Sequence, residues 1–244
     1  MKKLTFNLLS ILLVLVSFTQ VQAQTLDEII AKNTAAMGGK DKIQSITSIK
    51  MENTIEVMGN ESESSTIILN GKGAKTISDF NGQKMVQCYT DKGGWMINPM
   101  AGSADAAVMP EDQYKSGKSQ INIGATFLDY TTKGNKVELL GKEKLQNTDV
   151  YKVKVTTPNN LTVFYYFDAT TFYVIQTSTN SEMMGQQMEV ITKLSDFQKT
   201  EFGYVLPKTT TVSYGDQFSL VIKLKKAEFN LPVDTSIFDL GNLK

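Results

Sequence analysis

Histidine and arginine are missing from the chain of 244 residues, and cysteine occurs once, at Cys88. Without histidine, a Ser-His-Asp or Cys-His nucleophilic site cannot be built, and zinc sites lose their commonest nitrogen ligand. Without arginine, the planar fork that holds phosphate or carboxylate through two hydrogen bonds is excluded. A single cysteine allows no internal disulfide, so the fold depends on burial alone. We therefore expect no metal site and no cofactor.

An excess of either charge is also missing, since 25 basic and 25 acidic residues give a formal net charge of zero. All the basic residues are lysines, and no basic stripe runs along the chain. Nucleic acid binding normally requires such a concentration of positive charge. We therefore expect no nucleic acid partner.

Long apolar runs are confined to the first residues of the chain. The run Leu8–Val16 follows Met-Lys-Lys and precedes Val21-Gln22-Ala23, which is the order of a secretory signal peptide. It is shorter than the roughly 20 apolar residues that span a bilayer. We predict a signal peptide over residues 1–23, with an uncleaved membrane anchor as the alternative. Because Gln24 follows instead of a lipidated cysteine, we expect release into the periplasm, and secretion beyond the outer membrane stays open.

The segment after the predicted cleavage site has the features of an amphipathic helix. Apolar residues recur at helical spacing over Thr25–Met37. Thr25 and Glu28 have the spacing of a capping box, and Gly38-Gly39 supplies a stop signal. We therefore predict a helix over residues 25–37.

From Ile46 onward the apolar residues recur with a period of two, which is typical of half-buried strands. In the first strand Met51, Asn53 and Ile55 share one face. Pairs such as Asn70-Gly71 favour tight hairpin turns. We predict about eleven strands, joined by hairpins into one antiparallel sheet in meander order.

The segment Met100–Thr132 interrupts this rhythm. Pro110 suits the first turn of a helix, and Ile121–Tyr130 is a second helical or irregular stretch. A mobile cover over the sheet and an ordinary long connection are both open interpretations. A sheet of this many strands curls, and its apolar face needs a cover. We therefore predict one mainly β domain over residues 24–244. It is a strongly curved antiparallel sheet, or incomplete β-barrel, whose concave apolar face is covered by residues 25–37 and 100–132.

Four stretches resemble the LolA-like outer-membrane lipoprotein-sorting family: the helix ending in Met37-Gly38-Gly39, the strand Ile46-Thr47-Ser48-Ile49, the strand pair containing Asp168, and the tail Leu231-Pro232-Val233-Asp234 with Phe238. The resemblance is one of pattern and order over nearly the whole mature chain. It implies an incomplete barrel with a helical lid, and an apolar cavity that shields lipid or lipoprotein acyl chains for transport to the outer membrane. Carriers of this family use a lid-fastening arginine, which this sequence lacks.

Methionine is frequent, with 11 in the chain, and its flexible side chain adapts to varied apolar shapes. The residues that we expect to line the cavity and its lid are Ile30, Met37, Ile49, Met51, Ile55, Met85, Trp95, Met96, Met109, Ile123, Phe127, Phe164 and Tyr166. Ordinary core packing is the alternative for each of them. A tryptophan at the cavity mouth would change its emission when ligand enters. We expect a monomer that contacts membranes transiently.

Two other functions are considered. Glu52 and Glu56 on one strand, or Asp168 beside Tyr165, offer the paired carboxylates of a hydrolase. Alternation places the two glutamates on the wet face, and Asp168 most simply caps a turn, so we predict no enzyme. The second alternative is a non-catalytic envelope sensor or assembly scaffold, which would bind a protein partner through an exposed apolar patch.

Overall fold

The computed structural model describes residues 24–80, 82–99, 103–124, 126–128, 130, 134–183 and 186–240. The predicted signal peptide lies outside the described residues, as do parts of the predicted lid. None of the helices within the described ranges is long and apolar enough to cross a membrane. The elements are α1 (Leu26–Ala36), α2 (Lys40–Gln44), β1 (Ser48–Val57), β2 (Asn60–Leu69), β3 (Gly73–Phe80), β4 (Gln83–Thr90), β5 (Gly94–Asn98), β6 (Ser103–Val108), α3 (Glu111–Gly117), η2 (Lys118–Ile121), β7 (Lys136–Leu145), β8 (Thr148–Thr156), β9 (Thr162–Asp168), β10 (Val174–Met183), β11 (Gln186–Lys199), β12 (Val205–Tyr214), β13 (Phe218–Phe229) and η3 (Thr235–Phe238).

The strands form one antiparallel sheet of 13 strands in the order β6-β5-β4-β3-β2-β1-β13-β12-β11-β10-β9-β8-β7. The predicted mainly β, antiparallel class is confirmed, but the order differs from a single meander. Two meanders meet in the middle of the sheet, where β1 pairs with β13. As a result β6 and β7, which follow one another along the chain, lie at opposite edges of the sheet. The connection between them has to run across one face of the sheet.

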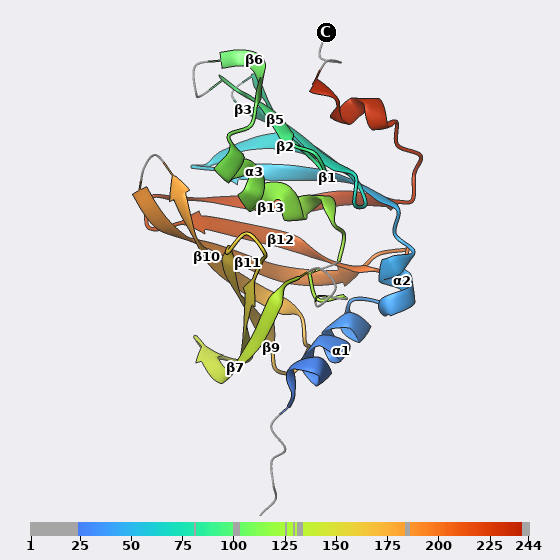
Figure 1. Cartoon of the computed structure of the whole chain (residues 1–244), viewed down its shortest axis with the longest axis vertical. Coiled ribbons are helices and arrows are strands. Elements are labelled where there is room, and N and C mark those ends of the chain that lie inside the picture. The colour runs from blue at the N-terminus through green and yellow to red at the C-terminus, as the bar shows by residue number, and fades with distance from the viewer. Residues whose placement is uncertain are drawn as a thin grey trace, which may run out of the picture.

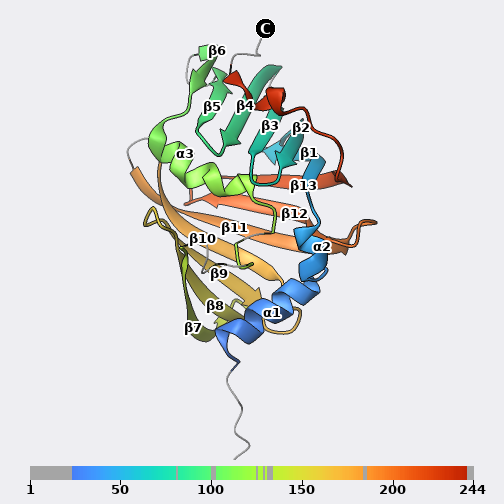
Figure 2. The ribbon, with the colours of Figure 1, turned by 45° about the vertical axis from the view of Figure 1, so that its right-hand side comes forward.

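The sheet curves strongly and stays open, as the views in Figures 1 and 2 show. The helices α1, α2 and α3 lie on its concave side (Figure 2). This arrangement confirms the predicted incomplete barrel with a helical cover. Side chains on the concave face alternate with side chains on the convex face, so each strand contributes every second residue to the covered side.

The N-terminal helix α1 begins at the predicted capping box. The Glu28 backbone N–H donates to Thr25 Oγ1 at 3.3 Å, and the Thr25 backbone N–H donates to Glu28 Oε2 at 2.9 Å. Gly38 follows the helix at a φ of 119°, where a side chain would be strained. A Cβ there would lie 2.6 Å from the carbonyl oxygen of Gly203, so the glycine also allows a close backbone approach. This approach brings the end of α1 against the start of β12.

Part of the predicted cover belongs to the sheet. Residues Ser103–Val108 form the edge strand β6, so the covering segment begins after Val108. The strand is rich in alanine and lacks the alternation of large apolar and polar side chains by which strands are predicted. It is a strand because it pairs with β5, where Val108 lies opposite Trp95 and Ala107 lies opposite Met96.

The C-terminal tail covers the convex face, which the sequence did not predict. In Figure 1, η3 and α3 lie on opposite sides of the strands β1 to β6. The Phe238 ring rests on Gly73, where a Cβ would lie 2.7 Å from it. The Phe238 carbonyl accepts a hydrogen bond from Trp95 Nε1 at 2.7 Å, and Lys75 Nζ donates to the Ile237 carbonyl at 2.9 Å. The tail thereby buries Trp95 and Cys88.

Candidate functional site

Three buried clusters attach the cover to the concave face. In the first, Ile29 and Ile30 of α1 pack with Phe127 against Val153 and Phe167. The second contains Ile43, Ile46, Ile49, Ile123 and Tyr204, and the third contains Ala74, Tyr89, Met109 and Ile121. Burial of each such large apolar side chain contributes about 1.5–3 kcal/mol. The cover is therefore fixed at several separate points, and space remains between them.

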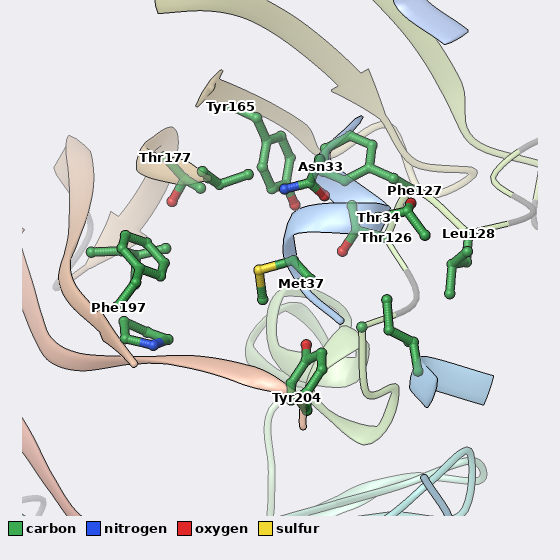
Figure 3. A pocket seen from close by; sticks show the side chains of 15 residues that line it. Asn33, Thr34, Met37, Thr126, Phe127, Leu128, Tyr165, Thr177, Phe197 and Tyr204 are labelled. Carbon is green, nitrogen blue, oxygen red and sulfur yellow. The ribbon is translucent and has the colours of Figure 1, made fainter. Parts of the chain in front are cut away.

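The first space, which we call the Met37 chamber, lies between α1, the segment around Phe127 and the strands β10 to β12. It has a volume of about 190 Å³ and is partly open to solvent. Figure 3 shows Met37 in its middle, surrounded by Tyr165, Thr177, Phe197 and Tyr204. The lining residues are Asn33, Thr34, Met37, Ile43, Gly124, Thr126, Phe127, Leu128, Tyr165, Val174, Thr177, Leu194, Phe197, Tyr204 and Pro207. None of these described residues carries a charge.

Burial in this chamber affects the two tyrosines that line it. Desolvation raises the pKa of Tyr204 to about 12 and also raises the pKa of Tyr165. Both phenols therefore stay neutral at ordinary pH. The chamber is consequently an uncharged environment, with its few polar atoms confined to hydroxyl and amide groups.

The second space, the Asn53 chamber, lies on the concave face of the strands β1 to β4, β12 and β13. It has a volume of about 530 Å³, within the usual range of small-molecule sites, and is partly open to solvent. Its apolar lining residues are Met51, Ile55, Ile68, Met85, Leu206, Pro207, Leu220, Ile222 and Leu224. Its polar lining residues are Asn53, Ser64, Thr66, Thr76, Ser78, Gln87, Gln120, Thr210 and Tyr214. Charged side chains are again missing from the described lining, and Pro207 belongs to both chambers.

A third pocket of about 450 Å³ adjoins the Met37 chamber and shares Thr126 and Tyr165 with it. Its inner side is formed by Val155, Val163 and other residues of β8 and β9, whereas Lys115 and Lys118 lie on the cover side. We call it the Lys118 pocket. It carries the positive charge that the two chambers lack.

The cover is fastened by amide and backbone hydrogen bonds. Asn70, in the turn between β2 and β3, accepts a hydrogen bond from the Ile123 backbone N–H at 3.0 Å. Its Nδ2 donates to the Ile46 carbonyl, also at 3.0 Å. The backbone N–H of Gly71 donates to the Ile121 carbonyl at 2.8 Å. One turn of the sheet thus holds the middle of the cover.

The helix α1 is fastened separately. Asn33 Nδ2 donates to the Phe172 carbonyl at 2.8 Å, and the Val205 backbone N–H donates to the Met37 carbonyl at 3.1 Å. The Tyr130 hydroxyl donates to Asp27 Oδ1 at 3.3 Å, which ties the far end of the cover to α1. Each of these bonds is worth only about 1 kcal/mol net, so a small number of them could break together.

The structure brings most of the expected cavity residues to the covered face. Met37 and Phe127 line the Met37 chamber, and Met51, Ile55 and Met85 line the Asn53 chamber. A further group packs in the clusters that hold the cover, namely Ile30, Ile49, Met96, Met109 and Ile123. Five of the expected positions therefore line the two chambers, which we together call the hollow, and five pack in the clusters that hold the cover.

Three of the expected residues lie on the convex face instead. Trp95 is opposite Cys88 and is buried under Phe238, so ligand in the hollow would not reach it. Phe164 and Tyr166 project from β9 on the side away from α1, where Lys152 Nζ lies 5.3 Å from each ring centroid. Their strand carries four aromatic residues in a row, and such a run does not indicate which alternate pair faces inward. The inward pair is Tyr165 and Phe167.

The carboxylates considered for hydrolysis are not paired with each other. Glu52 lies 3.3 Å from Lys50 Nζ, and Glu56 lies 3.3 Å from Lys223 Nζ, both on the convex face. Asp168 Oδ1 accepts from the backbone N–H groups of Thr170 and Thr171, as a turn cap does. Within the described ranges, no group of three or more His, Cys, Asp or Glu residues could hold a metal ion.

The polar residues of the Asn53 chamber were not among the expected site residues. The sequence did contain a signal for Asn53, because the alternation in β1 places it between Met51 and Ile55 on the inner face. The residues of β2 and β3 gave no such signal, since serine and threonine occur on both faces of these strands. The missed residues form the chamber's polar floor.

The sequence matches no family model and no curated protein. The fold is similar to that of a LolA superfamily protein from Nitrosomonas europaea, at 12% identity and a TM-score of 0.59, over 89% of this chain and 98% of that one. A DUF1329 family protein from Desulfovibrio piger gives 13% identity and a TM-score of 0.59 over 89% and 98% of the two chains. A putative outer membrane lipoprotein-sorting protein domain from Vibrio parahaemolyticus gives 11% identity and a TM-score of 0.57, over 88% of this chain and 96% of that one. The chain therefore has a LolA-like fold.

Proposed function

We propose that this protein is an exported carrier that shields lipid or lipoprotein acyl chains in the hollow between its curved sheet and its cover. The observation that carries the proposal is the hollow itself. Two adjoining chambers, of about 190 Å³ and 530 Å³, are lined without a charged residue. Both chambers are partly open to solvent, and an uncharged, largely apolar hollow of this kind is typical of small-molecule sites, which supports a ligand there.

The energetics favour an acyl chain as that ligand. Each methylene transferred from water to an apolar site gains about 0.8 kcal/mol. A chain of about a dozen carbons therefore gains several kcal/mol after the entropic costs of binding are subtracted. Met37, Met51 and Met85 supply flexible thioether side chains that adapt to chains of different length and shape.

A carrier must also release its cargo, and the fastening of the cover suits release. The middle of the cover depends on the hydrogen bonds of Asn70 and Gly71, and α1 depends on those of Asn33 and Met37. Opening would break these few bonds and separate the cover from the buried clusters, while the hydrogen bonds between the strands of the sheet stay intact.

The place and direction of transport are part of the proposal. The predicted signal peptide and the glutamine at the cleavage site support a protein that diffuses in the periplasm. We propose that it acts there as a monomer, contacts membranes transiently and delivers its cargo toward the outer membrane. The fold likeness to a LolA superfamily protein and to a putative outer membrane lipoprotein-sorting protein domain supports this assignment.

The described residues do not offer the scaffold alternative a corresponding surface. A protein that binds a partner through apolar contacts should expose a contiguous apolar patch. The large apolar side chains that are exposed in the described part of the chain come from separate strands, turns and the tail, and are Met58, Val108, Leu140, Leu231 and Leu240. Such scattered exposure is ordinary for a protein surface. We therefore favour the carrier.

Mass spectrometry of bound lipid tests the proposal. The protein is purified from native envelopes without detergent exchange, its lipids are extracted, and the extract is compared with one from protein delipidated beforehand. We expect acyl-containing lipid or lipoprotein in a fixed ratio to protein, and none in the delipidated sample. Repeated extracts without any acyl lipid, combined with failure to rebind one, would rule out the carrier.

A further inference from the structure

The Asn53 chamber has a polar floor that an acyl chain alone does not explain. Six uncharged polar residues of β1 to β4 project into it, namely Asn53, Ser64, Thr66, Thr76, Ser78 and Gln87. Gln120 of η2 adds a further amide from the cover side. A chamber built only to hold methylene groups would be lined with apolar side chains, as most of the Met37 chamber is.

Two residues of the floor are buried, and two hydrogen bonds join residues of the floor to one another. Asn53 is 7% exposed and Ser64 is 5% exposed. Asn53 Nδ2 donates to Ser64 Oγ over a long 3.5 Å, and Thr66 Oγ1 lies 3.0 Å from Thr76 Oγ1. The bond to Ser64 uses the nitrogen of the Asn53 amide, and the amide oxygen is an acceptor on the same side chain that lines the chamber.

The chemistry of the floor selects against charge. Hydroxyl and amide groups both donate and accept hydrogen bonds, so they match hydroxyls and ester carbonyls. An ionised carboxylate or phosphate would need a cationic partner, since burial of an unpaired charge is strongly unfavourable. The described lining of the chamber contains no lysine. The nearby cations Lys75 and Lys223 belong to the convex face, where Lys223 pairs with Glu56.

We propose that the polar floor of the Asn53 chamber binds the uncharged glycerol and ester groups of a neutral acylglycerol, while its acyl chain lies along the apolar lining of that chamber and extends toward the Met37 chamber. The inference rests on the proposed function and specifies the class of lipid. Pro207 lines both chambers, which places them side by side. The Asn53 side-chain oxygen accepts a hydrogen bond from a glycerol hydroxyl. Thr66 and Thr76 share one hydrogen bond, so one hydroxyl of this pair donates to an ester oxygen.

Lipids with the same chain and different polar groups test the assignment. Monooleoylglycerol and oleate are titrated against the delipidated full-length mature protein by displacement of a fluorescent acyl probe. We expect monooleoylglycerol to bind at least about tenfold more tightly than oleate at neutral pH, because only oleate carries a charge. Equal affinity, or a preference for oleate, would overturn the neutral-lipid inference and leave the carrier function intact. Absence of binding by either lipid would overturn both.

Substitutions in the floor locate the selectivity. Asn53→Leu and, separately, Thr76→Val remove polar atoms with little change in side-chain volume. Each should weaken monooleoylglycerol binding about tenfold and leave oleate binding nearly unchanged. Thr211→Val is the matched control, since Thr211 pairs with Val221 on the convex side of the neighbouring strand β12. If Asn53→Leu does not fold, the lipid affinities of Thr76→Val alone decide the test. Unchanged selectivity in folded Thr76→Val, or an equal loss in Thr211→Val, would contradict the assignment.

Discussion

At the scale of single residues, the clearest constraint lies at the contact of Phe238 with Cys88 and Trp95. Cys88 is fully buried, and its Sγ donates to the Phe238 carbonyl over 3.6 Å. Burial raises the pKa of the Cys88 thiol to about 12. The thiolate is the reactive form of cysteine, so this thiol should be inert in the folded protein. The lone cysteine is therefore a packing residue.

Phe238→Ala tests this contact. Removal of a buried phenylalanine ring should lower the free energy of unfolding by about 3 kcal/mol. It should also speed the reaction of Cys88 with a thiol reagent, because the tail no longer covers it. Stability is measured by denaturant unfolding, and the thiol by its rate of labelling. Leu240→Ala, at an exposed position of the same tail, should change neither quantity. Rapid labelling of the wild-type protein would contradict the burial of Cys88.

The buried acids also predict how stability depends on pH. Burial raises the pKa of Cys88 from 9.0 to about 12, and that of Tyr204 from 10.0 to about 12. The folded state therefore holds these protons more tightly than the unfolded state. Their stabilising contribution is complete below pH 9 and is lost as the pH rises toward about 12. The denaturant midpoint should fall over this range, and the fall should be smaller in Tyr204→Phe. An equally steep fall in that variant would exclude Tyr204 as a cause.

At the scale of elements, the fastening of the cover by Asn70 makes a direct prediction. Asn70→Ala leaves the Ile123 N–H and the Ile46 carbonyl without their side-chain partner. We expect a loss of about 2 kcal/mol in the free energy of unfolding and a faster release of bound acyl probe to lipid vesicles. Release is followed by stopped-flow fluorescence.

Asn230→Ala is the control for the cover. Asn230 also joins distant backbone, since it accepts from the Thr47 N–H at 2.8 Å and donates to the Ser45 carbonyl at 3.1 Å, but it does not contact the cover. This variant should lose stability and keep the wild-type release rate. Equal release rates in all three proteins would show that the cover is not what retains the ligand.

Elements with strong local signals could be predicted from the sequence, and those without them could not. The capping box of Thr25 and Glu28 fixed the start of α1, and the alternation around Met51 and Ile55 gave the inner face of β1. The alanine-rich strand β6 has no such pattern and was assigned to the cover. In β9 four consecutive aromatic residues give no alternation, so the sequence did not show which of them point to the concave face. Phe164 and Tyr166 were therefore predicted on the inner face. Trp95 was misplaced for a different reason, because only the distant tail determines which face of β5 is covered.

At the scale of the whole molecule, the order of the strands explains the site. Pairing of β1 with β13 places β6 and β7 at opposite edges, so their connection must cross the sheet. Curvature makes the concave side the one that this segment can cover. No local pattern specifies the pairing of strands so distant in the chain, and the sequence therefore predicted a simple meander. The hollow results from this crossing, because a narrow segment and one helix cannot fill a wide concave face.

The central claim is that acyl chains bind inside this hollow, and a substitution that fills the Met37 chamber tests it most directly. Thr177 projects into the chamber from β10, and Lys193 is an exposed residue of the neighbouring strand β11 that pairs with Gln176 on the convex face. Binding of a fluorescent acyl chain is measured for the wild type, Thr177→Trp and Lys193→Trp, after thermal unfolding has verified that all three fold. We predict that Thr177→Trp binds at least about tenfold more weakly, since the indole occupies the space of the chain, and that Lys193→Trp binds as the wild type does. Equal affinity in Thr177→Trp and the wild type would contradict the account.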